Sequence, residues 1–231
     1  MADTLNLAIG NKLYSSWSMR PWVLLKALGI PFTETVIPMY RDDTKAAMLK
    51  FAPTGMVPSI NHGDVVVWES LSLMEYIAEA FPDKNVWPKD VVARAEARSM
   101  SSEMHAGFRA LRMGCPVNLS RIFKLKDYGA DVHADIARIE AIFADYLNKY
   151  GGPFLFGDYS AADAMFTPVV TRLEHYQLPV SPTTRAYMDT ILNHFAYQAW
   201  RDEALQEPWY LSHYEAGHIV EKILVHSQAA R

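Results

Sequence analysis

Residues 14–20 read Tyr-Ser-Ser-Trp-Ser-Met-Arg, and the apolar run at 22–28 that follows them is typical of a buried helix. Pro21 stands between the two. Because proline has no N–H to donate inside a helix, it belongs in the first turn, and Ser18 is then the predicted N-cap. The serine pair at 15–16 is therefore predicted to lie in the loop immediately before the helix.

The segments around this motif alternate between strand and helix patterns over the first third of the chain. Two of the β-rich runs flank His62-Gly63-Asp64, which is typical of a hairpin. The order along the chain is a strand at 5–9, the helix described above, a strand at 33–37, a polar stretch that includes 41–45, hairpin strands at 57–61 and 65–68, and a helix capped by Ser70. This order predicts a small sheet covered by helices.

Beyond residue 90 the pattern shows helical periodicity alone. The predicted helices are 91–111, 131–150, 161–177 and 184–200, with breaks at glycine and proline residues between them. We therefore predict an α/β domain over residues 1–82, a linker over 83–89 and an all-α domain over 90–231.

The composition is that of a soluble globular protein. Half of the 231 residues are apolar, the formal net charge is −4, and acidic and basic residues are mixed along the chain. No apolar run reaches the roughly 20 residues of a membrane span, the N-terminus lacks the pattern of a secretory signal, and no basic stripe suits nucleic acid. The single cysteine, Cys115, excludes an internal disulfide, so we expect the reducing cytoplasm.

Four short motifs in this order resemble those of glutathione transferases, and the first is most similar to the zeta class and its bacterial relatives. Residues 14–20 match a Ser-Ser-Cys-x-x-Arg pattern at the start of the first helix, and Val57-Pro58 is similar to the family's cis-proline turn. Glu69-Ser70 resembles the pair that opens the next helix, and Ser160 to Asp163 resembles the capping box of the helical domain. The resemblance implies a thioredoxin-like N-terminal domain, a helical-bundle C-terminal domain, glutathione as co-substrate and a cytoplasmic homodimer.

The resemblance also implies roles for individual residues at the glutathione site. Ser15 is the predicted catalytic hydroxyl, which donates to the glutathione sulfur, with Ser16 beside it; a plain helix-capping role for both is the alternative. Val57 would pair with the cysteinyl backbone like an added strand, unless Pro58 is an ordinary trans proline. The remaining predicted contacts are Glu69 and Ser70 for the γ-glutamyl end and Lys45 for the glycyl carboxylate, and the alternative for these three is an exposed or capping role.

The second substrate is predicted to bind against Trp17, His105, Arg109 and Arg112. The last three follow one another at i, i+4 and i+7, so they share one face of the predicted helix 91–111. Such a basic face would favour an anionic electrophile, and a solvated stripe is the alternative. Trp17 stands where the zeta motif has its cysteine, which counts against the isomerase activity of that class and leaves an apolar floor beside the sulfur. No cysteine lies in this loop, which disfavours glutathione-dependent disulfide chemistry.

These observations lead to one predicted function and two alternatives. The predicted function is a glutathione transferase that activates the thiol of glutathione for attack on a small hydrophobic or anionic electrophile. The alternatives are a zeta-like isomerase, in which glutathione adds to a double bond and leaves again, and a non-catalytic binding or chaperone-like protein of the same fold. No metal is predicted, because His213 and His218 have no third ligand at a suitable spacing.

Overall fold

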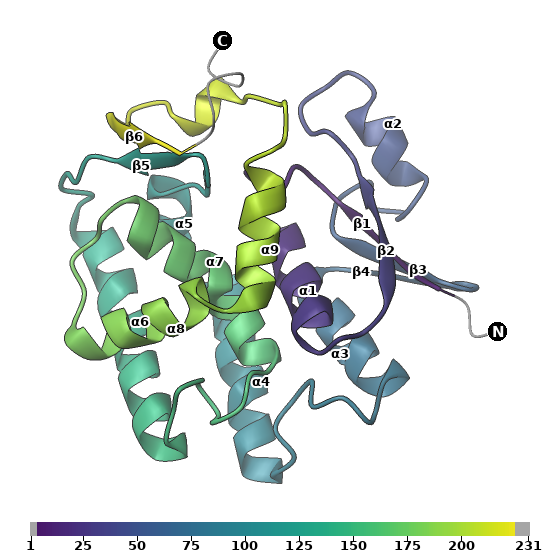
Figure 1. The fold of residues 1–231 in the computed structure, drawn as a ribbon, viewed down its shortest axis with the longest axis horizontal. Coiled ribbons are helices and arrows are strands. Elements are labelled where there is room, and N and C mark those ends of the chain that lie inside the picture. Colours follow the sequence, from purple (N-terminus) through teal and green to yellow (C-terminus); the bar gives the residue numbers. More distant parts are fainter. Residues whose placement is uncertain (1–3, 225–231) are drawn as a thin grey trace.

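A computed structural model describes residues 4–224, and its N-terminal part is built on a four-stranded sheet with the order β2-β1-β3-β4 (Figure 1). β1 runs parallel to β2 and antiparallel to β3, and β3 and β4 form the predicted hairpin. The order of strands and helices and the hairpin predicted from the sequence are thus confirmed. The strands are β1 (Leu5–Ile9), β2 (Phe32–Val36), β3 (Ser59–His62) and β4 (Val65–Trp68).

The central strand β1 alternates its side chains between the two faces of the sheet. Leu7 and Ile9 are buried in the main core on the face that α1 and α3 cover, whereas Ala8 packs with Met48 of α2 on the opposite face. The sequence pattern indicated only a polar stretch where α2 forms, because a six-residue helix with one buried side chain has too little periodicity to be recognised. The helices of this part are α1 (Ser16–Ala27), α2 (Thr44–Leu49) and α3 (Ser70–Ala80).

The C-terminal part is mostly helical, and two of the helices predicted for it are each split in two. The run 91–111 breaks at Phe108, whose φ of 52° lies in the left-handed region and cannot continue a right-handed helix. The run 184–200 breaks at His194, whose side chain caps the helix that follows. The helices are α4 (Val91–Ala106), α5 (Arg109–Gly114), α6 (Ala130–Tyr150), α7 (Ala161–His175), α8 (Pro182–Leu192) and α9 (Phe195–Ala204), followed by a 3-10 turn over Ser212–Tyr214.

A small antiparallel sheet of β5 (Arg121–Phe123) and β6 (Val220–Ile223) joins the end of the described chain to its middle. The prediction of helices alone beyond residue 90 is therefore wrong. Strands of three and four residues that lie so far apart in the sequence carry no local period, so no sequence pattern indicated them.

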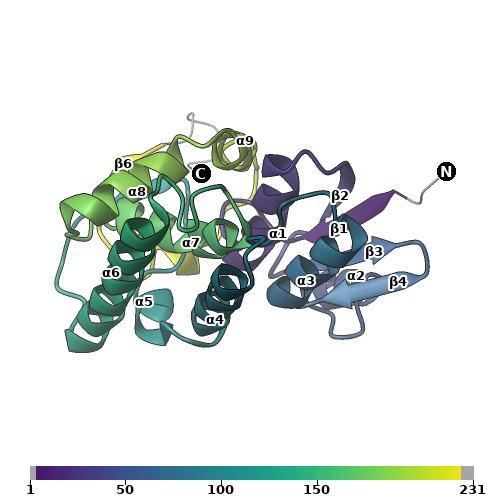
Figure 2. The ribbon, with the colours of Figure 1, turned by 90° about the horizontal axis from the view of Figure 1, so that it is seen from below.

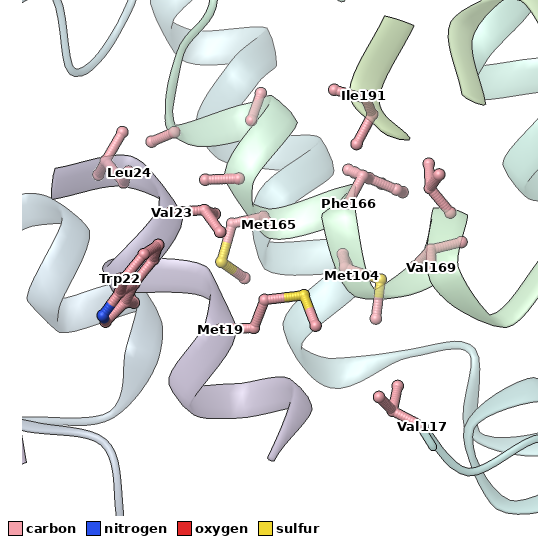
Figure 3. Close-up of a cluster of buried hydrophobic side chains, with 14 of the residues drawn as sticks. Met19, Trp22, Val23, Leu24, Met104, Val117, Met165, Phe166, Val169 and Ile191 are labelled. Atoms are coloured by element: carbon pink, nitrogen blue, oxygen red, sulfur yellow. The ribbon is translucent and has the colours of Figure 1, made fainter. Parts of the chain in front are cut away.

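Helix α1 lies between the sheet and the C-terminal helices (Figure 2). Met19 and Val23 of α1 pack with Met165, Phe166 and Val169 of α7, and all five side chains are buried (Figure 3). A helix that is apolar on nearly all sides is a buried helix. The start of α1, which carries the motif 14–20, is consequently held by both parts of the molecule.

The predicted domains include residues at both ends of the chain that the structure does not describe. Residues 1–3 and 225–231, at the outer ends of the predicted domains 1–82 and 90–231, lie outside the described residues. The predicted linker 83–89 runs through turns and bends between α3 and α4, and the division into domains stays a prediction. Within residues 4–224, no helix is long and apolar enough to cross a membrane.

Candidate active site

The beginning of α1 places the serine pair. Ser15, rather than the predicted Ser18, is the N-cap: its hydroxyl accepts from the Ser18 N–H at 3.4 Å and donates to the Ser18 hydroxyl at 2.7 Å. The Ser18 hydroxyl also accepts from the N–H of Gly10 at 3.1 Å, just after β1. Pro21 lies inside α1, so the prediction that it stands in the first turn is wrong. The burial of α1 outweighs the loss of the one backbone hydrogen bond that proline cannot donate.

Two buried arginines flank Ser16. Nη2 of Arg172 donates to the Ser16 hydroxyl at 3.4 Å, and Nη1 of Arg20 donates to the Ser16 carbonyl at 3.1 Å. Arg20 is 1% exposed and Arg172 is 4% exposed, yet no carboxylate among residues 4–224 forms an ion pair with either. Burial, and next the repulsion from Arg112, lowers the pKa of Arg172 to about 10. Burial also lowers the pKa of Arg20 well below its usual value. Arg172 is thus cationic at neutral pH, and neither arginine has a carboxylate partner in this part of the chain.

The indole of Trp17 is packed against cationic side chains. The guanidinium carbons of Arg20 and Arg112 lie 4.1 and 4.8 Å from its ring centroid, and the His105 ring lies 5.1 Å away in an edge arrangement. Cations over an indole face are attracted by the ring quadrupole. Trp17 also lines three neighbouring cavities, so it forms a wall common to all of them.

The first cavity, of about 240 Å³, lies beside β3 and the start of α3. The Val57-Pro58 bond at its edge is cis, as the resemblance implied. Glu69 has a φ of 70°, in the left-handed region that non-glycine residues rarely adopt, and this places it directly before the first turn of α3. The hydroxyl of Ser70 is buried and has no hydrogen-bond partner within residues 4–224. The lining residues are Trp17, Thr54, Met56, Val57, Pro58, Trp68, Glu69 and Ser70.

The second cavity, of about 500 Å³, is lined by aromatic side chains as well as by the serine pair 15–16. The rings of Tyr14 and Tyr214 lie 4.7 Å apart, and those of Tyr40 and His213 lie 4.5 Å apart. The Tyr14 hydroxyl accepts from the N–H of Leu211 at 3.2 Å, so the C-terminal segment closes against the loop before α1. This cavity suits a flat apolar group.

The third cavity, of about 390 Å³, is cationic and lies on the C-terminal side of Trp17. It brings together His105, Arg109 and Arg112 as predicted, although they lie on α4 and α5 and not on one continuous helix. Arg172 joins them, and no acidic residue lines the cavity. Burial lowers the pKa of His105, against the opposing effect of Glu69, so His105 is neutral at pH 7. The arginines therefore supply the positive charge of this cavity.

Lys45 lies outside the residues that line these three cavities. Its ammonium donates to the carbonyl of Thr54 at 2.5 Å and to that of Gly55 at 3.2 Å. Because Thr54 lines the first cavity, Lys45 supports the wall of that cavity through this hydrogen bond. Binding of the glycyl carboxylate by Lys45 stays a prediction.

The described residues contain no group of three or more His, Cys, Asp or Glu side chains that could hold a metal ion. His213 lines the second cavity, whereas His218 packs against Tyr128 and Tyr176. Burial raises the pKa of Cys115 to about 12, which makes this thiol a poor nucleophile at neutral pH.

Sequence reasoning missed Arg172 and the three tyrosines of the second cavity. The one available signal for Arg172 was its place in the mostly apolar stretch 164–173, since a charge buried in such a helix needs a function or a partner. Tyr14, Tyr40 and Tyr214 come from distant parts of the chain, and no spacing in the sequence connects them.

Comparison with known proteins gives a consistent result. Residues 14–80 match the family model of the glutathione S-transferase N-terminal domain. The chain is 26% identical over 180 residues to a Caenorhabditis elegans protein named "Probable maleylacetoacetate isomerase", covering 74% of this chain and 82% of that protein. It is 25% identical over 193 residues to the maleylpyruvate isomerase of Ralstonia sp, covering 74% of this chain and 86% of the relative. A glutathione transferase homolog from Burkholderia GL BGR1, solved with bound glutathione, superimposes with a TM-score of 0.66 at 20% identity, over 87% of this chain and 97% of that one.

Proposed function

Since the chain belongs to the glutathione S-transferase family, we propose that it is a glutathione-dependent enzyme that directs the thiol of glutathione at a small anionic electrophile. The observation that carries this proposal is the meeting of three cavities at Trp17, where Ser15 and Ser16 line the second cavity and Ser16 also lines the third. One cavity suits a peptide, one a flat apolar group and one an anion. Family membership also supports a cytoplasmic homodimer, which stays part of the proposal.

Glutathione fits the first cavity. Ser70, at the N-terminus of the 11-residue helix α3, offers its unpartnered hydroxyl and its N–H to the γ-glutamyl carboxylate. Glu69 lines the same cavity and would accept from the γ-glutamyl ammonium, and the backbone of Val57 would pair with the cysteinyl residue. Val57 and Trp17 line both the first and the second cavity, so a thiol held in this way points toward the serine pair.

Activation of the thiol needs only modest stabilisation of its anion. A free thiol has a pKa near ~8.5, and lowering it by ~2 units requires about 2.7 kcal/mol. One hydroxyl donor to a charged acceptor supplies about 1.5–3 kcal/mol, and the start of α1 adds about 0.3–1 kcal/mol. The cationic Arg172 beside Ser16 favours the anion further. Ser15 is proposed as the donor, which requires its O–H to turn from the Ser18 hydroxyl to the sulfur when glutathione binds. Ser16 is the alternative that the geometry leaves open.

The electrophile is proposed to carry a carboxylate. Arginine holds carboxylates through parallel hydrogen bonds, and the guanidinium of Arg172 is both buried and without a countercharge in the described chain. The same molecule would place its apolar body in the second cavity, against Tyr14 and Tyr214. Bond formation then takes place between the glutathione sulfur and the electrophilic carbon, at the junction of the cavities.

An isomerase is the second candidate, because two of the relatives bear isomerase names. In that reaction the thiolate adds to a double bond of an unsaturated acid, the adduct rotates about the resulting single bond, and the thiolate leaves again. Transfer consumes glutathione, whereas isomerisation regenerates it. Product analysis with glutathione at a known starting amount therefore separates the two reactions.

Titration of bound glutathione tests the proposed function directly. We expect the ultraviolet absorbance of the thiolate in the complex to appear about 2 pH units below its titration in free glutathione. The non-catalytic alternative predicts weak binding of glutathione or no change of its thiol pKa. A bound thiol that titrates like the free one would therefore remove the enzyme proposal.

Ser15→Ala is expected to lower kcat about 30-fold and to change glutathione affinity much less. The hydroxyl acts on the sulfur anion, and a hydrogen bond to a charged acceptor is worth about 2 kcal/mol. Because Ser15 also caps α1, its loss destabilises the fold by about 1 kcal/mol, so thermal denaturation should accompany the steady-state kinetics.

Ser16→Ala is the matched control for this change, since Ser16 is the neighbouring hydroxyl on the same cavity wall. If Ser16→Ala slows turnover and Ser15→Ala leaves it unchanged, the catalytic hydroxyl has been assigned to the wrong serine. Glu69→Ala should show the opposite pattern to Ser15→Ala, with weaker glutathione binding and a nearly unchanged kcat.

A further inference from the structure

We infer that Glu207 is a positioning residue, which fixes the loop that presents the serine pair; this inference rests on the proposed function. Glu207 follows α9, almost 200 residues from the loop in sequence, and is 9% exposed. It lines none of the three cavities described above, so it would act on the reaction only through the loop.

The carboxylate of Glu207 holds two successive amides of the chain. Its Oε1 accepts from the N–H of Lys12 at 2.7 Å, and its Oε2 accepts from the N–H of Leu13 at 3.2 Å. Hydrogen bonds to an ionised acceptor are roughly twice as strong as neutral ones, and two parallel bonds also fix direction. The peptide plane between Lys12 and Leu13 is therefore set by a side chain from the C-terminal part.

The neighbouring backbone groups of the loop have fixed partners as well. The carbonyl of Lys12 accepts from the indole N–H of Trp200 at 3.1 Å, and the carbonyl of Leu13 accepts from the N–H of Leu119 at 3.1 Å. The carbonyl of Asn11 accepts from the N–H of Ser15 at 2.8 Å. Glu207, Trp200 and Leu119 of the C-terminal part thus hold the backbone of Lys12 and Leu13, and Glu207 binds the amides of both.

The side chain of Lys12, whose amide Glu207 binds, pairs with two other carboxylates. The Lys12 ammonium is buried, pairs with Glu34 at 2.7 Å and with Glu203, and lies 4.9 Å from the ring centroid of Trp22. Glu203 and Glu207 therefore belong to one network but make different contacts. Glu203 contacts only the end of the Lys12 side chain, whereas Glu207 contacts the backbone of the loop.

Because Glu207 contacts the backbone of the loop and Glu203 does not, the two carboxylates should differ in their effect on the reaction. A catalytic hydroxyl must stay within about 3 Å of the sulfur, and a displacement of about 1 Å can cost roughly 100-fold in rate. The proposed glutathione contacts Val57, Glu69 and Ser70 lie on other elements and do not depend on the loop. Loss of Glu207 should consequently affect the chemical step and spare the binding of glutathione.

Glu207→Ala tests this in the full-length protein. We expect kcat to fall about 10- to 100-fold, KM for glutathione to change less than about threefold, and the pKa of the bound thiol to rise toward that of free glutathione. Glu207→Gln keeps one acceptor oxygen but turns an NH₂ group toward the second amide, so it should fall between the wild type and the alanine variant. Circular dichroism and the melting temperature establish that each variant is folded. If Glu207→Ala does not fold, Glu207→Gln provides the test.

Glu203→Ala is the matched control, because it removes a carboxylate from the same network without touching the loop backbone. It should lower the melting temperature slightly and leave both kcat and the thiol pKa at the wild-type values. The inference is overturned if folded Glu207 variants keep the wild-type thiol pKa and kcat, or if Glu203→Ala shifts them equally. A wild-type protein that leaves the thiol pKa unshifted would instead contradict the proposed function, so the two failures are distinguishable.

Discussion

Replacing Arg172 by methionine should lower kcat/KM for carboxylate-bearing electrophiles by about 100-fold or more and leave neutral electrophiles within about threefold. Arg172 is 4% exposed, lines both the second and the third cavity, and has no carboxylate partner within the described chain. A bound carboxylate would complete this pair, and truncating one member of a buried pair costs about 2–5 kcal/mol. Initial rates with an acidic electrophile and with its neutral ester measure the difference.

Arg109→Ala is the control for this prediction, because Arg109 lines the third cavity but is exposed to solvent. It should change kcat/KM for the acid by less than about fivefold, since exposed ion pairs contribute about 0–1 kcal/mol. Arg172 also donates to the buried carbonyl of Cys115 at 3.0 Å, so Arg172→Met should lower the melting temperature, and the comparison of acid with ester separates this loss from the loss of substrate binding. Equal losses for acid and ester would show that Arg172 supports the fold and does not bind the substrate.

The second large effect is on stability: Asp163→Ala is expected to lower the free energy of unfolding by about 4 kcal/mol. Asp163 is fully buried and forms a capping box with Ser160 at the start of α7. Its Oδ1 also accepts from the N–H of Leu155 at 3.0 Å and from the hydroxyl of Tyr187 at 3.0 Å. Removal of the carboxylate leaves these donors buried and unpaired, at about 1–3 kcal/mol each. Urea denaturation at pH 7 measures the loss.

Asp158→Ala provides the comparison, because Asp158 is an exposed acid in the preceding loop and should change stability by less than about 0.5 kcal/mol. The pH dependence gives a second check. Burial raises the pKa of Asp163 to about 6, although its hydrogen bonds oppose this shift. The folded protein therefore retains a proton that the unfolded chain releases near pH 4, and this group's contribution falls as the pH rises from about 4 to 6. Asp163→Asn should lack that fall; its persistence in the variant would contradict the assignment.

The order of elements was predictable from the sequence because it depends on local patterns. The hairpin around His62-Gly63-Asp64 follows from turn chemistry, which acts within a few residues. The start of α3 was predicted to within one residue, but its N-cap is Glu69 and not the predicted Ser70, whose hydroxyl makes no capping hydrogen bond. The same motifs brought Val57, Glu69 and Ser70 to one cavity. The resemblance to the glutathione transferase motifs thus indicated three of the residues that line the first cavity, whereas Thr54, Met56 and Trp68 were not predicted.

The features that were missed depend on contacts between distant residues. Pro21 is tolerated inside α1 because the helix is buried on nearly all sides, a fact that no local pattern shows. The break at Phe108 and the pairing of β5 with β6 also follow from the C-terminal packing. Arg172 reaches Ser16 across 156 residues, so its place in the site required the structure.

Trp17 separates the three cavities, and this has a consequence for the size of molecule that the protein admits. Each cavity by itself holds only part of a substrate, and the indole is the wall that each shares with the other two. Arg20 and Arg112 pack against this indole, so it is not free to rotate aside. A small side chain at this position, such as the cysteine of the zeta motif, would join the compartments into one open cleft. We therefore expect the side chain of Trp17 to limit the size of the molecules that the site admits.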